Sequence, residues 1–229
     1  MVKNHLSRFV APKTWPISVK KTKWTVRPIS GPHKLKSCLP IALILREMLK
    51  VTNNLRETKN ILHRKLVKID RKTINEYKYP VGILDVIEVE NSPPKRLVLD
   101  EQGKFKLIDV KDTSLKPLKI INKKLLKNKK LQLNFSDGRN LIIDKDNYKV
   151  NDTVIFDLEK KKITKTLKFE KGAKVYLIGG KHAGLIGTLN ETQVTSSKTK
   201  QEKITFDYEK KTYETLREYA YVVEENMVK

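Results

Sequence analysis

Glycines gather in one short stretch of this chain, where a backbone without side chains could cradle a phosphate. The segment "GGKHAGLIG" (residues 179–187) holds four of the nine glycines. A nucleotide-binding P-loop requires Lys and then Ser or Thr after its last glycine, but Leu185 and Ile186 follow Gly184, and no helix-forming pattern comes next. The flanking "VYLI" and "LIGTL" predict strands, so we expect these glycines to serve a turn and a close backbone approach.

Candidates for a nucleophile or a metal ligand are equally few. Cys38 is the single cysteine, which excludes an internal disulfide and a cysteine-based zinc site and is typical of a cytoplasmic protein. His33 lies close to Cys38 in the sequence, and no predicted core surrounds the two to support a thiol nucleophile. Four scattered histidines and acidic residues without metal-ligand spacing complete the set. We therefore predict no catalytic residue, no metal and no cofactor.

The charge of the chain indicates a partner more clearly. The formal net charge is +23 over 229 residues, enough for one large domain or two to three small ones. Such a surplus repels itself in the folded state, and nucleic acid is the usual partner that relieves it. No apolar run reaches the roughly 18 residues of a membrane-spanning helix. The start "MVKNHLSRF" lacks a signal-peptide core, so we expect no membrane partner and a cytoplasmic location.

Residues 1–40 are predicted to form a basic, extended arm. Ten Lys or Arg residues precede the first acidic residue, Glu47, and both tryptophans, Trp15 and Trp24, lie in this segment. Its prolines forbid a long helix, and no apolar periodicity indicates a core of its own. We expect the arm to become ordered on RNA, with cations on phosphates and ring planes available for stacking. The alternative is a disordered basic tail, and packing of either tryptophan on protein stays open.

Two short helices and a hairpin are predicted over residues 41–91. Apolar residues in "IALILREMLK" recur from Ile41 with the spacing of one helix face. Asn54 and Glu57 form a capping box for a second helix, "LRETKNILHRK". The apolar side of that helix consists of Leu55, Ile61 and Leu62. Strands are predicted in "LVKID" and "ILDVIEV".

This unit resembles the alpha-L RNA-binding domain, which several ribosomal proteins, RNA-modifying enzymes and a bacterial tRNA synthetase share. The matching segments are "LRETKNIL", "LVKID" and "YPVGILDVIEV". Arg71 stands where the family usually has glycine, so a longer or differently twisted turn is expected in place of a tight Asp-Gly turn. Asp85 occupies a position that suggests a pseudouridine synthase aspartate. No separate catalytic domain accompanies it, and Asp85 is interpreted as a turn residue before a strand.

Motifs in the flanks extend the resemblance to essentially the whole chain. "APKTWPI", "TKWTVRP", "GPHKLKSCLPIALILR", "YKYPVGILDVIEV", "KVNDTVIFDL" and "GGKHAGLIGTL" occur in the order found in the archaeal and eukaryotic "e" family of small-subunit ribosomal protein four. The segment "KGAKVYLIGGKHAGLIGTL" resembles a KOW motif, the first hairpin of an SH3-like barrel. The compact length resembles archaeal members. The resemblance implies a non-enzymatic constituent of the small ribosomal subunit with rRNA and neighbouring small-subunit proteins as partners and no small-molecule substrate.

The predicted fold class is α+β, in four parts. They are a basic N-terminal arm (1–40), an alpha-L RNA-binding domain (41–91), a central β-rich domain (92–168) and a KOW/SH3-like β-barrel (169–229). In the central part, a three-residue loop around Asp137-Gly138 is expected to pair Phe135 with Leu141. Alternating Val154, Phe156 and Leu158 predict a further strand.

The residues predicted to contact RNA are cations, aromatic rings and hydrogen-bonding groups on the arm, on and after the second helix, and on the glycine-rich loop. They are Arg8, Lys13, Trp15, Lys20, Lys21, Lys23, Trp24, Arg27, His33, Lys34, Arg56, Lys59, Asn60, His63, Arg64, Lys65, Lys68, Lys181 and His182. For Lys181 and His182 the alternative is a solvated loop whose glycines are purely architectural. Two other functions stay open: an RNA-modifying enzyme, and a transcription-elongation or RNA-chaperone factor.

Overall fold

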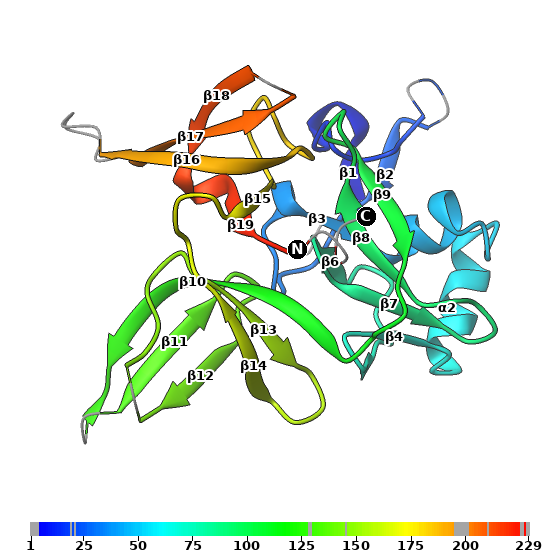
Figure 1. Ribbon diagram of the computed structural model, residues 1–229. Helices are drawn as coiled ribbons and strands as arrows, with labels where there is room; N and C mark the ends of the chain where they lie inside the picture. Colours follow the sequence, from blue (N-terminus) through cyan, green and yellow to red (C-terminus); the bar gives the residue numbers. More distant parts are fainter. Residues whose placement is uncertain are drawn as a thin grey trace. The chain divides into compact units, whose positions relative to one another are not determined.

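The protein is an α+β molecule, as predicted, with a few short helices and many strands (Figure 1). The computed structural model describes residues 5–18, 20, 22–127, 130–144, 146–194, 202–209, 211–224 and 227. The chain divides into two compact units. Unit 1 comprises Met1–Leu99 and Lys104–Ser114, and unit 2 comprises Asp100–Gly103 and Leu115–Lys229.

Unit 1 combines all but one of the described helical elements with three small antiparallel sheets. Its helical elements are η1 (Arg8–Val10), η2 (Leu35–Ser37), α1 (Ile41–Leu43), η3 (Ile44–Met48) and α2 (Leu55–His63). Its strands are β1 (His5–Ser7), β2 (Trp24–Val26), β3 (Cys38–Pro40), β4 (Val67–Ile69), β5 (Lys72–Thr73), β6 (Pro80–Gly82), β7 (Val86–Val89), β8 (Lys95–Leu99) and β9 (Phe105–Asp109). The sheets have the strand orders β1-β2, β3-β6 and β5-β4-β7-β8-β9.

The first predicted helix forms, but it is not a regular amphipathic α-helix. Of the residues predicted for this helix, only those of α1 are α-helical. They are followed by the π-helical turn η3, after which Leu49 N donates to Ile44 O at 2.8 Å. The apolar pattern predicts one buried face, whereas all five residues from Ile41 to Leu45 are buried. This segment is therefore packed on every side and not on one face only. The wider π-helical turn of η3 follows directly after it.

The turn between β4 and β5 is tight, so the prediction of a longer turn at Arg71 was wrong. Ile69 pairs with Lys72, which leaves only Asp70 and Arg71 in the turn, with φ angles of 50° and 66°. The Asp70 carboxylate accepts from Val86 N at 3.0 Å, and Asp70 N donates to Val86 O at 2.9 Å. These bonds to β7 hold the turn, and Arg71 adopts the left-handed conformation that glycine has in the related pattern.

Replacing Arg71 by glycine is expected to stabilise the protein by up to about 1 kcal/mol, because the left-handed conformation costs a non-glycine residue roughly 1–2 kcal/mol while the freedom of glycine in the unfolded chain takes back about 0.4–1 kcal/mol. The variant also loses the contact of Arg71 Nε with the buried Glu88 Oε1, at 3.5 Å, which reduces the gain further. Urea unfolding measures the difference. Lys72→Gly, in the exposed strand β5, is the matched control and should lower stability. Equal destabilisation by both variants would contradict the strain argument.

Strands β8 and β9 extend the sheet of β4 and β7 instead of starting a new one. Val86 of β7 pairs with Arg96 of β8, and Leu97 of β8 pairs with Leu107 of β9. The pairing thus joins residues on both sides of the boundary expected between residues 91 and 92. The four-part division of the chain stays a prediction.

Unit 2 contains two five-stranded antiparallel sheets. Its strands are β10 (Leu115–Leu125), β11 (Leu131–Phe135), β12 (Asn140–Ile143), β13 (Thr153–Asp157), β14 (Lys162–Leu167), β15 (Lys174–Leu177), β16 (Ile186–Val194), β17 (Glu202–Tyr208), β18 (Lys211–Leu216) and β19 (Ala220–Val222), and its helical turn is η5 (Arg217–Tyr219). The strand orders are β12-β11-β10-β13-β14 and β18-β17-β16-β15-β19. Each sheet has its own apolar cluster.

The central sheet has the predicted apolar face with a different register. Leu133, not Phe135, pairs with Leu141, and Phe135 N donates to Arg139 O around a three-residue loop. The shift by two residues keeps the same side chains on the apolar face, because side chains alternate with a period of two. Val154, Phe156 and Leu158 are buried in this cluster, which confirms the predicted strand.

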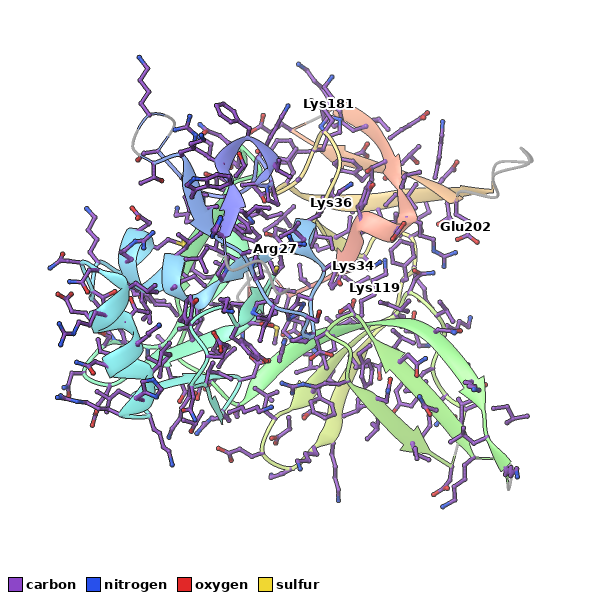
Figure 2. The ribbon with its side chains drawn as sticks, turned by 180° about the vertical axis from the view of Figure 1, so that it is seen from behind. Arg27, Lys34, Lys36, Lys119, Lys181 and Glu202 are labelled. Atoms are coloured by element: carbon purple, nitrogen blue, oxygen red, sulfur yellow. The ribbon has the colours of Figure 1, made fainter. Side chains whose placement is uncertain are left out.

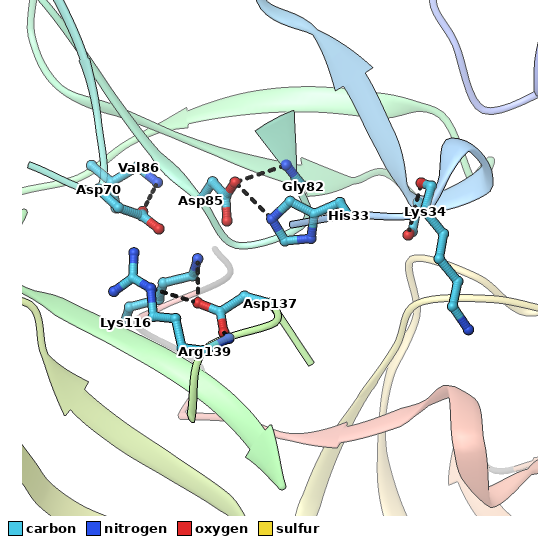
Figure 3. A network of polar contacts seen from close by, with 10 residues as sticks. His33, Lys34, Asp70, Gly82, Asp85, Val86, Lys116, Asp137 and Arg139 are labelled. Carbon is cyan, nitrogen blue, oxygen red and sulfur yellow. Dashed lines mark hydrogen bonds and ion pairs between the residues drawn. The ribbon is translucent and has the colours of Figure 1, made fainter. Parts of the chain in front are cut away.

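Two lysines of β10 are buried and support the fold. Lys119 Nζ donates to the carbonyl oxygens of Arg217, Glu218 and Ala220 at 2.9, 3.0 and 2.9 Å, and so joins β10 to η5 and β19 (Figure 2). Burial, with the nearby Arg217, lowers the pKa of Lys119 to about 8. Lys116 Nζ lies 3.4 Å from Asp137 Oδ2 (Figure 3). These two ammonium groups face protein atoms and are not surface cations.

Candidate nucleic-acid interface

Helix α2 begins at the predicted capping box. Asn54 Oδ1 accepts from Glu57 N at 2.9 Å, and the Glu57 carboxylate accepts from Asn53 N at 2.7 Å and from the Asn54 side-chain amide at 2.8 Å. The return contact reaches Asn53, one residue earlier than in the usual box. The cap fixes the first residue of α2, and with it the direction in which each later side chain points.

The two sides of α2 differ as predicted, with one addition. Leu62 is fully buried, whereas Leu55 and Ile61 are only partly buried. The other buried residue is Thr58, whose hydroxyl donates to Asn54 O and lies 3.0 Å from Thr52 Oγ1. The sequence did not predict that Thr58 would be buried, because a hydroxyl is usually exposed. Its burial depends on these two local hydrogen bonds.

All of the predicted RNA-contacting residues on α2 and immediately after it are exposed. They are Arg56, Lys59, Asn60, His63, Arg64, Lys65 and, on β4, Lys68. Lys65 has a φ of 61° just after the helix, where the chain turns towards β4. The structure thus brings five permanent cations to one helix and the strand that follows it, a surface suited to successive phosphates.

Tyr77 adds an aromatic ring that the sequence analysis missed. Lys59 Nζ lies 5.0 Å and Lys78 Nζ 5.4 Å from the centroid of the Tyr77 ring. The backbone of this loop is held by bonds from Ala42 N to Tyr77 O and from Ile29 N to Lys78 O, both 3.1 Å. Lys78, next to Tyr77 in "EYKYP", was the available signal, but only the fold brings Lys59 to the same ring.

In the described residues, the arm is not simply extended but folds into local structure. Strands β1 and β2 pair, and Leu6 and Thr25, which lie opposite each other in this pairing, are both buried. Trp15 is 4% exposed and its Nε1 donates to Cys38 O at 2.8 Å. Of the two alternatives for this residue, the structure therefore has packing on protein. Trp24, in contrast, is half exposed.

The predicted cations of the arm lie at its surface. Lys13, Lys20, Lys23, Arg27 and Lys34 are exposed, and Arg8 is half-buried. Lys34 immediately precedes η2 and Lys36 lies within it; both are labelled in Figure 2. Lys21 lies outside the described residues.

His33 lies against Asp85 and not at an open surface. Its Nε2 hydrogen-bonds to Asp85 Oδ2 at 3.0 Å, and the same oxygen accepts from Gly82 N at 2.8 Å (Figure 3). The two side chains are 8% and 2% exposed. A Cβ on Gly82 would lie 2.3 Å from the imidazole, so the ring is closely packed. This pair ties the arm to the turn before β7, and it engages Nε2 of the ring, so that nitrogen is not free for a phosphate.

The same region gives no support to a thiol nucleophile. Cys38 is fully buried in β3, and burial, with the nearby Asp85, raises the pKa of its thiol to about 12. The reactive thiolate is therefore absent at neutral pH. Among the described residues, no group of three or more His, Cys, Asp or Glu could hold a metal ion.

The glycine-rich loop joins β15 to β16, as the strand predictions on both sides require. Gly180 and Gly184 have φ angles of 81° and 93°, and a Cβ on Gly184 would lie 1.7 Å from Asp100 O. The glycines thus allow a left-handed turn and a close backbone approach. Lys181 is exposed, but His182 packs its ring 4.7 Å from that of Tyr213. Only the lysine side chain is openly presented to a phosphate.

The described helices include none with both the length and the hydrophobicity to cross a membrane. Two family models match the chain. The model of Ribosomal family S4e matches residues 96–163, and that of the RS4NT (NUC023) domain matches residues 2–36.

Curated relatives match almost the whole chain. The small ribosomal subunit protein eS4 of Methanocella arvoryzae is 37% identical over 97% of this chain and 95% of the relative. The eS4 protein of Methanosphaera stadtmanae is 37% identical over 96% of this chain and 92% of its own. The crystal structure of the 30S ribosomal protein S4e from Thermoplasma acidophilum matches with a TM-score of 0.69 and 28% identity, covering 82% of this chain and 95% of that chain.

Proposed function

The chain belongs to ribosomal family S4e, the archaeal and eukaryotic type of small-subunit protein four, and from this membership we propose that it is a structural constituent of the small ribosomal subunit. In this role it binds rRNA and supports subunit assembly and translation. The observation that carries the proposal is the 37% identity to an eS4 protein over 97% of the chain. The net charge of +23 agrees with an RNA partner.

The proposed rRNA contact has two main parts, which are the exposed cations of α2 and β4 and those of the arm. Lys181 of the glycine-rich loop adds a further cation. We propose neighbouring small-subunit proteins as the other partners, and the ribosome in the cytoplasm as the location.

The finer domain layout is part of the same proposal. The unit of α1, α2, β4 and β7 is assigned as an alpha-L RNA-binding domain, supported by the capped helix and the tight turn after β4. The sheet of β15–β19 is assigned as a KOW-type SH3-like barrel. The assignment is supported by its five antiparallel strands in the order β18-β17-β16-β15-β19, in which the last strand, β19, pairs with the first, β15.

The alternative of an RNA-modifying enzyme is not favoured by the site chemistry. Asp85 is 2% exposed and accepts from His33 and Gly82, and the Cys38 thiol is protonated. A transient transcription or chaperone factor would use the same basic surfaces, so the structure does not distinguish it from a ribosomal constituent. Sedimentation with the small subunit does.

In a sucrose gradient of cell lysate, the protein is expected to sediment with small subunits at one copy per subunit and to stay with them through a high-salt wash. A constituent held by rRNA and by neighbouring proteins at the same time dissociates slowly even when salt weakens its phosphate contacts, whereas a transient factor with few contacts is released. Quantitative mass spectrometry against other small-subunit proteins gives the stoichiometry. Recovery mainly at the top of the gradient would contradict the proposal.

A further inference from the structure

The arm presents two large aromatic side chains to solvent. Phe9 of η1 is 83% exposed and Trp24 of β2 is 51% exposed, and Val10 beside Phe9 is 66% exposed. Their segments are held together by the pairing of β1 with β2 and by a bond from Arg8 N to Lys23 O at 3.1 Å. Two exposed rings on adjacent backbone segments form a patch that typically marks an interaction site.

Phe9 contributes little to the packing of the arm, and Trp24 contributes only part of its surface, through its contact with His5. That role belongs to Trp15, which is buried and hydrogen-bonded to Cys38 O, and to Leu6 of β1. Burying an aromatic ring is one of the largest single contributions to a core, so leaving two in water while a third is buried nearby indicates a partner for the exposed pair.

Each ring has a cation over it. Arg8 Cζ lies 5.0 Å from the centroid of the Phe9 ring, and Lys23 Nζ lies 5.6 Å from that of Trp24. The imidazole of His5 meets the Trp24 ring edge-on, with centroids 4.9 Å apart. No acidic residue occurs before Glu47. The partner of this patch therefore has flat apolar faces and negative charge close together.

We propose that Phe9 and Trp24 stack on unpaired bases of an RNA strand, with Arg8 and Lys23 on the adjoining phosphates. In duplex RNA the base faces are covered by neighbouring base pairs, whereas unpaired bases can stack on aromatic side chains. A protein partner would need to match the cations with carboxylates as well as cover the rings. The inference rests on the proposed rRNA-binding function and specifies the kind of RNA that the arm takes.

Leucine variants of the full-length chain test stacking, because leucine keeps apolar bulk but has no ring face. Phe9→Leu and Trp24→Leu are each expected to weaken binding of a single-stranded RNA of about 12 nucleotides by roughly 5- to 150-fold. Binding of a duplex of the same length should change by less than about 2-fold, because exposed residues away from the phosphates contribute little there. The slope of affinity against salt should stay as in the parent protein, since no phosphate contact is removed.

Trp24 also reports stacking directly. Its fluorescence is expected to be quenched when the single strand binds, and the quenching should disappear in Trp24→Leu, where only the buried Trp15 remains. Val10→Ala is the matched control, since it removes an exposed apolar group from the same patch without removing a ring.

The outcomes separate this inference from the function on which it rests. Unchanged single-strand affinity in both leucine variants, with RNA still bound, overturns stacking alone and indicates that a neighbouring protein covers the patch. A loss in Val10→Ala as large as in Phe9→Leu also overturns it, because apolar contact and not the ring face would then be responsible. Absence of binding to any RNA at low salt overturns the proposed function as well.

Discussion

The affinity of the purified chain for small-subunit rRNA is expected to fall by about 10³- to 10⁵-fold between roughly 50 and 200 mM salt, as it does when six to ten phosphates are neutralised. Each neutralised phosphate releases condensed counterions, and added salt opposes that release. The exposed cations of the predicted interface that the structure describes are Lys13, Lys20, Lys23, Arg27, Lys34, Arg56, Lys59, Arg64, Lys65, Lys68 and Lys181. Buried Lys116 and Lys119 are not among them, since their ammonium groups are used within unit 2.

Fluorescence anisotropy with labelled rRNA across a salt series measures this slope. A charge-neutral change at the same surface, Asn60→Ser, is the control and should leave the slope unchanged. Replacing Lys65 or Lys68 by Gln should reduce the slope by about one per lost phosphate contact. A nearly flat response of the parent protein to salt would contradict the electrostatic basis of the interface.

The sequence predicts the parts of this protein that depend on local patterns. The capping box of Asn54 and Glu57 places the start of α2, and the spacing of its cations places them at the surface. Alternation of apolar residues gives strand β13 and its buried face. These features follow from neighbours within a few residues, so they could be predicted without knowing the rest of the fold.

What the sequence leaves open or predicts wrongly lies where distant segments meet. Trp15, for which packing on protein was one of two alternatives, is buried with its Nε1 donating to Cys38 O, and His33 is engaged because the turn before β7 presents Asp85. The tight turn at Arg71 depends on Val86, which holds Asp70 from another strand. In each case a contact across many residues outweighs the local preference, and a single sequence contains no signal of that contact.

Opposite effects are expected from the two sides of α2. Leu62 has no exposed surface, so Leu62→Ala should cost roughly 2–5 kcal/mol in unfolding free energy and leave the RNA affinity of the folded protein almost unchanged. In Arg56→Ala/Lys59→Ala, two exposed cations are lost, and stability should change by less than about 1 kcal/mol, including the Lys59 contact with the Tyr77 ring.

The affinity of the double alanine variant should fall for cognate and non-cognate RNA alike, with a shallower salt slope, because phosphate contacts carry no sequence information. Urea unfolding and anisotropy on the same preparations give both quantities. Leu55→Ala serves as a graded control, since this residue is only partly buried and should cost less than Leu62. If the double variant unfolds early and retains its RNA affinity, the cationic side of α2 supports the fold, and the rRNA contact must be assigned to the arm instead.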